Sequence, residues 1–355
     1  MNRNVASLLL FCATFLVAPS AASAVTIDTV PVGNRGNAND PATGNLYGGV
    51  AYDYRIGTTE VTVGQYTAFL NAVAATDTYA LYDTQMYSDF KIHAIERFGA
   101  SGSYSYAVMG SPMSPNHPVT YVSWGDAARF ANWLHNGQPT GAQSLSTTES
   151  GAYFLNGATS SAALNAVSRS SGATWVIPSE SEWYKAAYHQ PAVQGGDVDN
   201  YWTYPTRTNA EPDSDQPPGD PNIQRNVANF YRDDGQPDGY SDGYAVNGST
   251  SWPGFGALTE AGAYTSARSP YGTFDQAGNV YEWNEALRSS SSRGMRGGSW
   301  GDVSLNLRAS SRNNLGASDQ SAGVGFRVAF VPEPSSFVLA ALGVIGLVVW
   351  RRRKR

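Results

Sequence analysis

The 355-residue chain contains a single cysteine, Cys12, close to its N-terminus. This cysteine falls within the apolar run Leu8–Val17, which follows the positive Arg3 and precedes Ala22-Ser23-Ala24. A positive start, an apolar run of this length and small residues at a cleavage site are typical of a secretory signal peptide. We therefore predict cleavage after Ala24 by signal peptidase. An uncleaved anchor is the alternative, although a run of about ten residues is too short to span a bilayer comfortably.

Cleavage at this point leaves a body without cysteine, and that absence is the strongest constraint on its fold and chemistry. Such a body has no disulfide, no thiolate nucleophile and no cysteine metal ligand. Exported domains often depend on disulfides for stability. This one must instead be held together by its hydrophobic core or by bound cations with oxygen ligands.

At the other end, Val331-Pro332-Glu333-Pro334 precedes an apolar stretch, Phe337–Trp350, and the basic segment Arg351–Arg355. As a helix, the apolar stretch would be roughly 21 Å long, against a hydrocarbon core of roughly 30 Å. This length is usable because arginine side chains can extend to the membrane surface. The basic end favours the cytoplasm. We therefore predict a transmembrane helix that leaves residues 25–334 outside the inner membrane.

Pro332-Glu333-Pro334, the short apolar segment and the terminal arginine cluster resemble the PEP-CTERM sorting tail of Gram-negative bacteria. The resemblance implies that an exosortase cuts near the triplet and passes the protein to the cell envelope or extracellular matrix. Residues 331–355 would then be a sorting signal. A plain single-pass anchor is the alternative.

The body between these segments is acidic. Without Arg3, Glu333 and the last five residues it carries 17 basic and 28 acidic side chains, a net charge of −11. Such a charge argues against nucleic acid and anionic membrane surfaces as partners. The body is long enough for one large domain or two small ones.

Hydrophobic periodicity and capping residues predict a few helices joined by short strands and long loops. Thr62, Ser123 and Ser179 are expected N-caps, and Glu182 has capping-box spacing from Ser179. Residues 137–172 are expected to form a surface insertion and 190–224 a further excursion. The pattern indicates an α+β domain with about three helices. The expected elements are strands at 52–59, 118–122 and 174–177, helices at 61–74, 124–136 and from 179, and short strands after 229.

Six segments occur in an order that resembles the formylglycine-generating enzyme family, also called the sulfatase-modifying factor domain. The resemblance covers roughly residues 50–330, after a lead-in segment at 25–49. It implies a C-type-lectin-like, loop-rich α+β fold. The segments are Gly57-Thr58-Thr59-Glu60-Val61-Thr62, Pro118-Val119 with Val122-Ser123-Trp124 and Ala127, Ile177-Pro178-Ser179-Glu180-Ser181-Glu182-Trp183, Gly278-Asn279-Val280-Tyr281-Glu282-Trp283, Arg296-Gly297-Gly298-Ser299-Trp300, and Gly325-Phe326-Arg327-Val328.

The chain departs from the active enzymes of this family at the copper site. Those enzymes use two cysteines just after the Gly-Gly-Ser-Trp segment, and the matching positions here are Asp302 and Leu307. Neither is a soft ligand for copper(I). Ser299 matches a family active-site serine but has no metal partner. We therefore expect no copper and no formylglycine-generating activity. Another branch of the fold uses iron held by histidines. The chain has four histidines, and they show no metal-ligand spacing: His93, His117, His135 and His189.

The resemblance also implies two calcium sites built from side-chain oxygens and main-chain carbonyls, the ligands that this hard cation prefers. The first would use the side chains of Asn229 and Asp242 with the carbonyls of Phe230 and Tyr244. The second would use the carboxylates of Asp275 and Glu282 with the carbonyls of Gly278 and Val280. A carboxylate among aromatic residues, as Glu282 is, needs a partner. An ion pair with Arg296 or Arg327 is the alternative to a cation.

These observations lead to the hypothesis of a calcium-stabilised module, displayed at the envelope, that binds a protein or polysaccharide of the envelope or matrix. A metal-dependent oxidoreductase with an altered active site is the alternative. Aromatic residues in predicted loops could either recognise such a ligand or hold the loops in place: Tyr201, Trp202, Tyr204, Trp252, Phe255 and Tyr271. The expected contact residues are Ser299, Trp300, Asp302, Asn306, Arg308, Arg312 and Asn313.

Overall fold

The computed structural model describes residues 24–111, 113–219 and 226–332. The predicted signal peptide up to Ser23, the residues from Glu333 onward and the predicted C-terminal transmembrane helix lie outside these ranges. Within the described ranges, no helix has the length and apolar character needed to cross a membrane.

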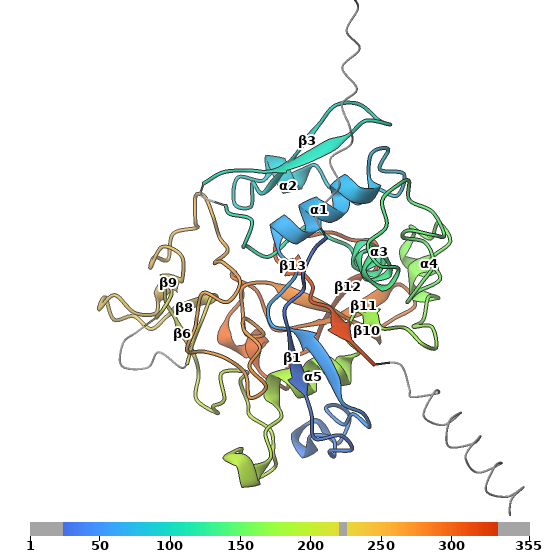
Figure 1. The fold of residues 1–355 in the computed structure, drawn as a ribbon. Coiled ribbons are helices and arrows are strands. Elements are labelled where there is room, and N and C mark those ends of the chain that lie inside the picture. The colour runs from blue at the N-terminus through green and yellow to red at the C-terminus, as the bar shows by residue number, and fades with distance from the viewer. Residues whose placement is uncertain (1–23, 112, 220–225, 333–355) are drawn as a thin grey trace, which may run out of the picture.

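Two four-stranded sheets form the framework (Figure 1). The first has the antiparallel order β1-β2-β14-β5, so that strands from both ends of the domain are neighbours. The second has the order β12-β11-β10-β13, with β10 and β13 parallel. Their bounds are β1 Thr29–Val32, β2 Tyr54–Gly57, β5 Trp175–Val176, β10 Tyr281–Leu287, β11 Ser292–Arg296, β12 Asn313–Gly316, β13 Val324–Gly325 and β14 Ala329–Phe330.

Three two-stranded ribbons extend from this framework. They pair β3 (Ile95–Phe98) with β4 (Ser105–Val108), β6 (Asp213–Ser214) with β7 (Val227–Ala228), and β8 (Tyr231–Asp233) with β9 (Asp242–Tyr244). Short strands and long loops with few helices confirm the predicted α+β, loop-rich fold.

The three predicted helices are present as α1 (Val63–Val73), α3 (Trp124–His135) and α5 (Glu180–Tyr188). Each begins after the predicted N-cap, and each cap is a complete capping box. In a capping box, the side chain of the cap accepts from the backbone N–H of the third helical residue, and the side chain of that residue accepts from the backbone N–H of the cap. Shorter helices are α2 (Gln85–Ser88), α4 (Ser161–Asn165), η1 (Pro41–Thr43), η2 (Ala192–Gln194) and η3 (Ser304–Leu307).

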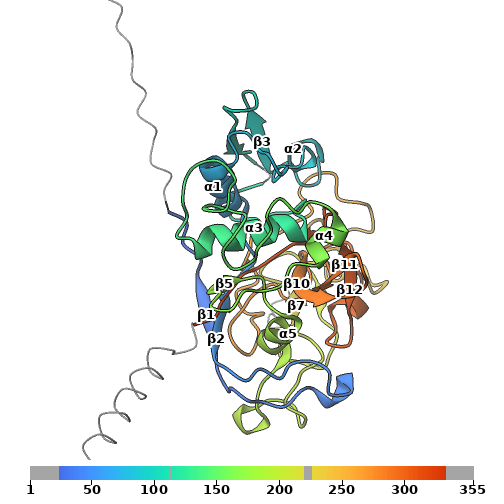
Figure 2. The same ribbon diagram turned by 90° about the vertical axis from the view of Figure 1, so that its right-hand side faces the viewer.

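The core lies where the first helices meet the sheets. Figures 1 and 2 show α3 on one side of the sheet that contains β10 and α5 on the other. Between α1 and α3, the ring of Tyr66 packs edge to face with Phe69 at 5.4 Å and with Phe326 at 6.5 Å. The ring of Phe130 stacks on Tyr66 at 6.1 Å. All four rings are fully buried. Aromatic packing of this kind gives a body without cysteine much of its hydrophobic stability.

Two expectations about local structure were wrong. The strand predicted at 118–122 is an irregular segment, because Tyr121 adopts a positive φ of 57° and interrupts the extended backbone. The insertion predicted at 137–172 is part of the core. Its Tyr153 is fully buried, and its Glu149 forms a buried ion pair with Arg129 of α3 at 2.7 Å. The lead-in segment contributes β1 to the first sheet.

Candidate functional site

The predicted contact face begins at a tight turn after β11. Gly297 and Gly298 have φ values of 102° and 75°, a region that favours glycine. A Cβ atom on Gly298 would lie 2.7 Å from Cδ1 of Leu307. The turn therefore brings Ser299 and Trp300 against the interior.

Asp302 and Leu307, the two positions that the resemblance matches to the copper cysteines, have internal roles. The Asp302 carboxylate accepts hydrogen bonds from the backbone N–H of Ser299 at 3.0 Å and from its hydroxyl. Leu307 is fully buried in a small apolar cluster with Tyr204 and Phe230. One position caps a turn and the other fills the core.

The other predicted contact residues are also engaged inside the domain. Asn306 donates to the hydroxyl of Tyr281 at 2.8 Å, and Arg308 donates to the hydroxyl of Tyr204 at 2.8 Å. Arg312 binds Glu180, whose carboxylate also accepts from Arg296 at 2.8 Å. Trp300 is 5% exposed, and Asn313 begins β12. The seven predicted residues lie on one segment, but most of their polar atoms contact the protein itself.

Glu282, predicted for the second calcium site, is fully buried and has an ion-pair partner. Arg327, also fully buried, donates from Nη2 to Oε1 at 2.6 Å and from Nε to Oε2. The indole of Trp183 donates to Oε2 at 2.7 Å. Of the two arginines that the sequence offered, Arg327 pairs with Glu282 and Arg296 pairs with Glu180.

Asp275 and Glu60 form a second group of buried carboxylates near this ion pair. Asp275 accepts from the backbone N–H of Gly262 at 2.5 Å. Glu60 accepts from Asn279 Nδ2 at 3.1 Å on Oε1, whereas its Oε2 is buried and has no hydrogen-bond partner in the described part of the chain. Burial raises the pKa of Asp275 to about 6. Burial also raises the pKa of Glu60 well above its usual range, and the charge of Asp275 raises it further.

The backbone around Asp275 is tightly bent. Asp275, Gly278 and Asn279 all have positive φ, at 58°, 78° and 62°. Such conformations cost energy for residues other than glycine and often occur at ligand clamps. The charge of Arg327 lowers both pKa values but does not offset burial, so the orphaned oxygen and the two carboxylates suit either a shared proton or a bound cation. The donor set therefore fits a hard cation at Asp275 and Glu60, while Glu282 is already paired.

The residues of the first predicted calcium site are spread along a β-ribbon. Asp242 pairs with Asp233 and Tyr244 with Tyr231. Asn229 and Phe230 directly precede β8, and the backbone bends at Phe230. The Phe230 carbonyl accepts a hydrogen bond from the hydroxyl of Ser214. The same hydroxyl donates to the Gly243 carbonyl at 3.0 Å, so Phe230 lies close to the β9 backbone between Asp242 and Tyr244.

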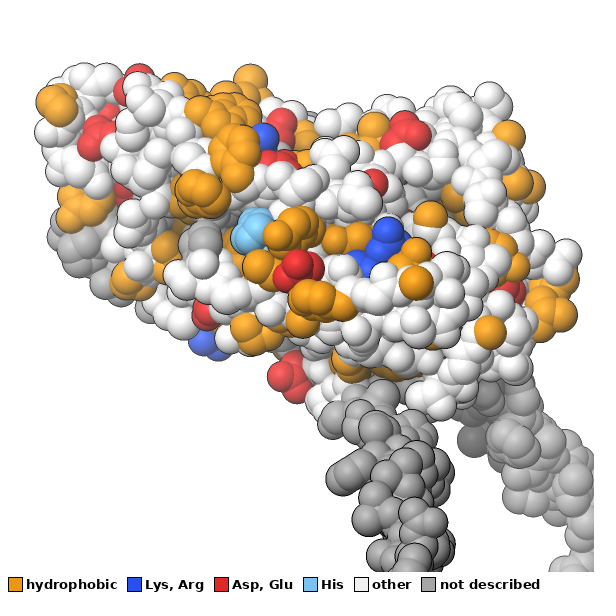
Figure 3. Space-filling view, turned by 90° about the horizontal axis from the view of Figure 1, so that it is seen from above, with side chains coloured by type: hydrophobic (Ala, Val, Ile, Leu, Met, Phe, Trp, Pro, Cys, Tyr) orange, Lys and Arg blue, Asp and Glu red, His pale blue; other side chains and the backbone are white. Residues whose placement is uncertain are grey.

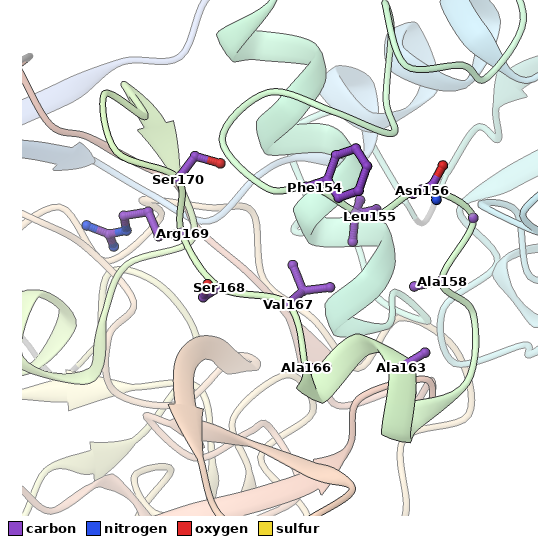
Figure 4. Close-up of a pocket in the computed structure, with 11 residues that line it drawn as sticks. Phe154, Leu155, Asn156, Ala158, Ala163, Ala166, Val167, Ser168, Arg169 and Ser170 are labelled. Carbon is purple, nitrogen blue, oxygen red and sulfur yellow. The ribbon is translucent and has the colours of Figure 1, made fainter.

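Metal clusters and cavities elsewhere in the described residues give little support for a binding site. Within the described residues, no group of three or more His, Cys, Asp or Glu side chains lies close enough to hold a metal ion. A cavity of about 700 Å³ beside α4 is lined by small and apolar residues of 154–170 (Figure 4). Its only charged lining residue, Arg169, forms ion pairs with Glu182 at 2.7 Å and Glu285 at 2.8 Å. In Figure 4 this side chain points away from Phe154 and Leu155.

Sequence reasoning did not single out Glu60 as a site residue. An acidic residue between Thr59 and Val61, in an otherwise uncharged stretch of the first family segment, is a signal for a buried carboxylate. Its proximity to Asp275 depends on contacts between segments more than 200 residues apart, and no local pattern contains that information.

Comparisons with known proteins agree with this architecture. The family model of the sulfatase-modifying factor enzyme 1-like domain matches residues 29–331, and that of the PEP-CTERM protein-sorting motif matches residues 330–354. No curated protein matches the chain.

Solved structures similar to the chain include CarF, with 20% identity, coverage of 86% of this chain and 98% of that chain, and a TM-score of 0.47. Variable protein 1 of Treponema denticola has 16% identity, coverage of 88% and 98%, and a TM-score of 0.49. PvdO from Pseudomonas aeruginosa has 19% identity, coverage of 86% and 91%, and a TM-score of 0.41.

Proposed function

Because the chain belongs to the sulfatase-modifying factor enzyme 1-like family and ends in a PEP-CTERM sorting motif, we propose that it is a non-catalytic, calcium-stabilised binding module displayed at the cell envelope. The observation that carries this proposal is the role of Asp302 and Leu307. A capping carboxylate and a buried core side chain occupy these positions, where the resemblance places the two thiolates of the active enzymes. The domain keeps the scaffold and uses those positions for its own stability.

Calcium would be held by Asp275 and Glu60, with main-chain carbonyls of the bent segment that includes Gly278 and Val280 completing the shell. Bound calcium would neutralise two buried carboxylates that otherwise repel each other, and this role is structural. Asn229 and Asp242 remain a second candidate pair with less support, because neither carries an unpartnered buried oxygen in the described part of the chain.

The sorting motif supports an exported protein that is processed at the membrane of a Gram-negative envelope. Signal peptidase would release the N-terminus after Ala24, and an exosortase would cut near Pro332-Glu333-Pro334. Among the described residues the last strand is β14, which ends at Phe330, where the match to the sorting motif begins. Delivery would leave the domain at the envelope or in the matrix, where it would bind a protein or polysaccharide.

A thermal melt with and without calcium tests the structural part of this proposal. We expect the chelator EGTA to lower the melting temperature of the purified protein. Calcium at 100 times its dissociation constant would restore about 2.7 kcal/mol. Glu60→Gln removes one of the two buried charges, so this variant should melt at the same temperature with calcium and with EGTA. Glu211→Gln, at an exposed side chain, should respond like the wild type. A wild-type melting temperature that EGTA leaves unchanged would contradict the calcium assignment.

A further inference from the structure

Three aromatic rings are exposed on two neighbouring loops. Phe90 is 47% exposed, Trp252 56% and Phe255 66%. The rings of Phe90 and Phe255 lie edge to face at 5.9 Å, and the loops are joined by a hydrogen bond from Ala257 N–H to the Lys91 carbonyl at 3.1 Å. We call these three residues the aromatic platform. Figure 3 views the end of the molecule that carries α2 and β3, where hydrophobic side chains gather among few charged ones.

Buried aromatic rings hold Trp252 in place. Its indole packs edge to face on Trp300 at 5.1 Å and on Tyr244 at 5.3 Å. Both supporting rings are less than 10% exposed. An exposed ring that buried rings hold in one orientation loses little entropy when a ligand covers it, and this favours binding. The platform thereby adjoins the segment after Gly298 through Trp300.

The other loop aromatics named from the sequence behave differently. Tyr201 is 4% exposed and Tyr204 is 1% exposed. The Trp202 indole donates to Gln190 at 2.9 Å, and the Tyr271 hydroxyl contacts His189 at 2.9 Å. These four residues hold their loops in place. Trp252 and Phe255 are thus the two members of the set that are available for recognition.

The platform is electrically balanced within an acidic body. The Lys91 ammonium lies 5.0 Å from the centre of the Phe90 ring and 5.8 Å from that of Trp252, and its charge is matched by Asp89 at 3.4 Å. The surrounding body carries a net charge of −11. A polyanion would therefore be repelled by the domain as a whole, whereas an uncharged ligand pays no such cost.

We propose that the aromatic platform binds a neutral polysaccharide. The C–H faces of pyranose rings pack on exposed aromatic faces, and their hydroxyl groups stay hydrated or hydrogen-bond to polar neighbours. All three platform side chains are aromatic, a composition that suits sugar rings better than the mixed aliphatic and aromatic surface of a protein partner. This inference rests on the proposed function and specifies both the ligand class and the contact residues.

Affinity electrophoresis of the purified protein tests the proposal directly. Native gels would contain a soluble neutral polysaccharide (mixed-linkage β-glucan, galactomannan or dextran) or the acidic polysaccharide alginate. We expect at least one neutral polysaccharide to retard the wild type and alginate to have no effect. Trp252→Ala and Phe255→Ala should each reduce the retardation at least tenfold. Phe154→Ala removes an equally exposed aromatic ring near α4 and should leave the retardation unchanged.

The possible outcomes separate this inference from the proposed function. Circular dichroism and the melting temperature would first establish that each variant is folded. Retardation that survives in both platform variants but is lost in Asn306→Ala would overturn the platform and leave the binding module intact. Retardation by alginate alone, or by no neutral polysaccharide, would overturn the ligand class. In that last case, a chelator-sensitive melt would still support the calcium-stabilised module.

Discussion

Replacing Glu282 by Gln tests whether the buried ion pair with Arg327 organises the centre of the domain. Both side chains are 0% exposed, and Arg327 makes two hydrogen bonds to the carboxylate while Trp183 makes a third. The substitution keeps the shape of the side chain but removes the carboxylate that is hydrogen-bonded to the buried Arg327, leaving only the more distant charges of Glu60 and Asp275. Removing one partner of such a pair costs about 3–5 kcal/mol. This is a large share of the roughly 5–15 kcal/mol that stabilises a typical domain.

The cost can be measured by guanidinium chloride unfolding with linear extrapolation, in calcium-containing buffer. Glu211→Gln is a matched control, because its carboxylate lies 3.9 Å from Arg232 and its side chain is 43% exposed. An exposed pair of this kind contributes less than about 1 kcal/mol. A free energy of unfolding for Glu282→Gln within about 1 kcal/mol of the wild type would refute the reasoning.

Two further predictions concern the turn after β11 and the stability at low pH. Gly298→Ala should destabilise the domain by clearly more than the ~1 kcal/mol expected for Gly172→Ala. Both positions have positive φ, but only Gly298 lies against Leu307. Denaturant unfolding compares the two variants, and equal losses of stability would contradict the packing argument. Burial, with the nearby charge of Lys185, lowers the pKa of His189 from 6.5 to about 4. The unfolded chain therefore binds this proton first, and stability should fall as the pH drops from 6.5 to 4. In His189→Asn the decline in urea midpoint over this range should be shallower, and an identical decline would exclude His189 as a cause.

Local features of the fold could be predicted from the sequence. Thr62, Ser123 and Ser179 each place a hydrogen-bonding side chain three residues before a suitable partner, so the start of each long helix is encoded within four residues. The Gly297-Gly298 turn is likewise local. The interruption at Tyr121 was missed because a positive φ at an aromatic residue has no propensity signal and depends on the surrounding packing.

The candidate site was only partly predictable, because its contacts join distant segments. The sequence indicated that Glu282 needs a partner, but it offered two arginines and could not choose between them. The choice of Arg327 follows from the parallel pairing of β10 with β13. This pairing places Gly325 opposite Glu282, and Arg327 follows two residues later. The pairing of Glu60 with the Asp275 region, and the joining of Phe90 to the Trp252 loop, are also long-range features. Composition suggested that residues 137–172 were exposed, yet buried Tyr153 shows that a polar-looking insertion can cover the core.

The metal content of the purified mature protein tests most directly whether this scaffold serves as a calcium-stabilised binding module. Elemental analysis after gel filtration in buffer without added metals would give the stoichiometry of calcium, copper and iron in one measurement. We expect calcium close to one equivalent and neither copper nor iron above trace levels. Stoichiometric copper or iron would contradict the account and would favour a metal-dependent oxidoreductase with an altered active site.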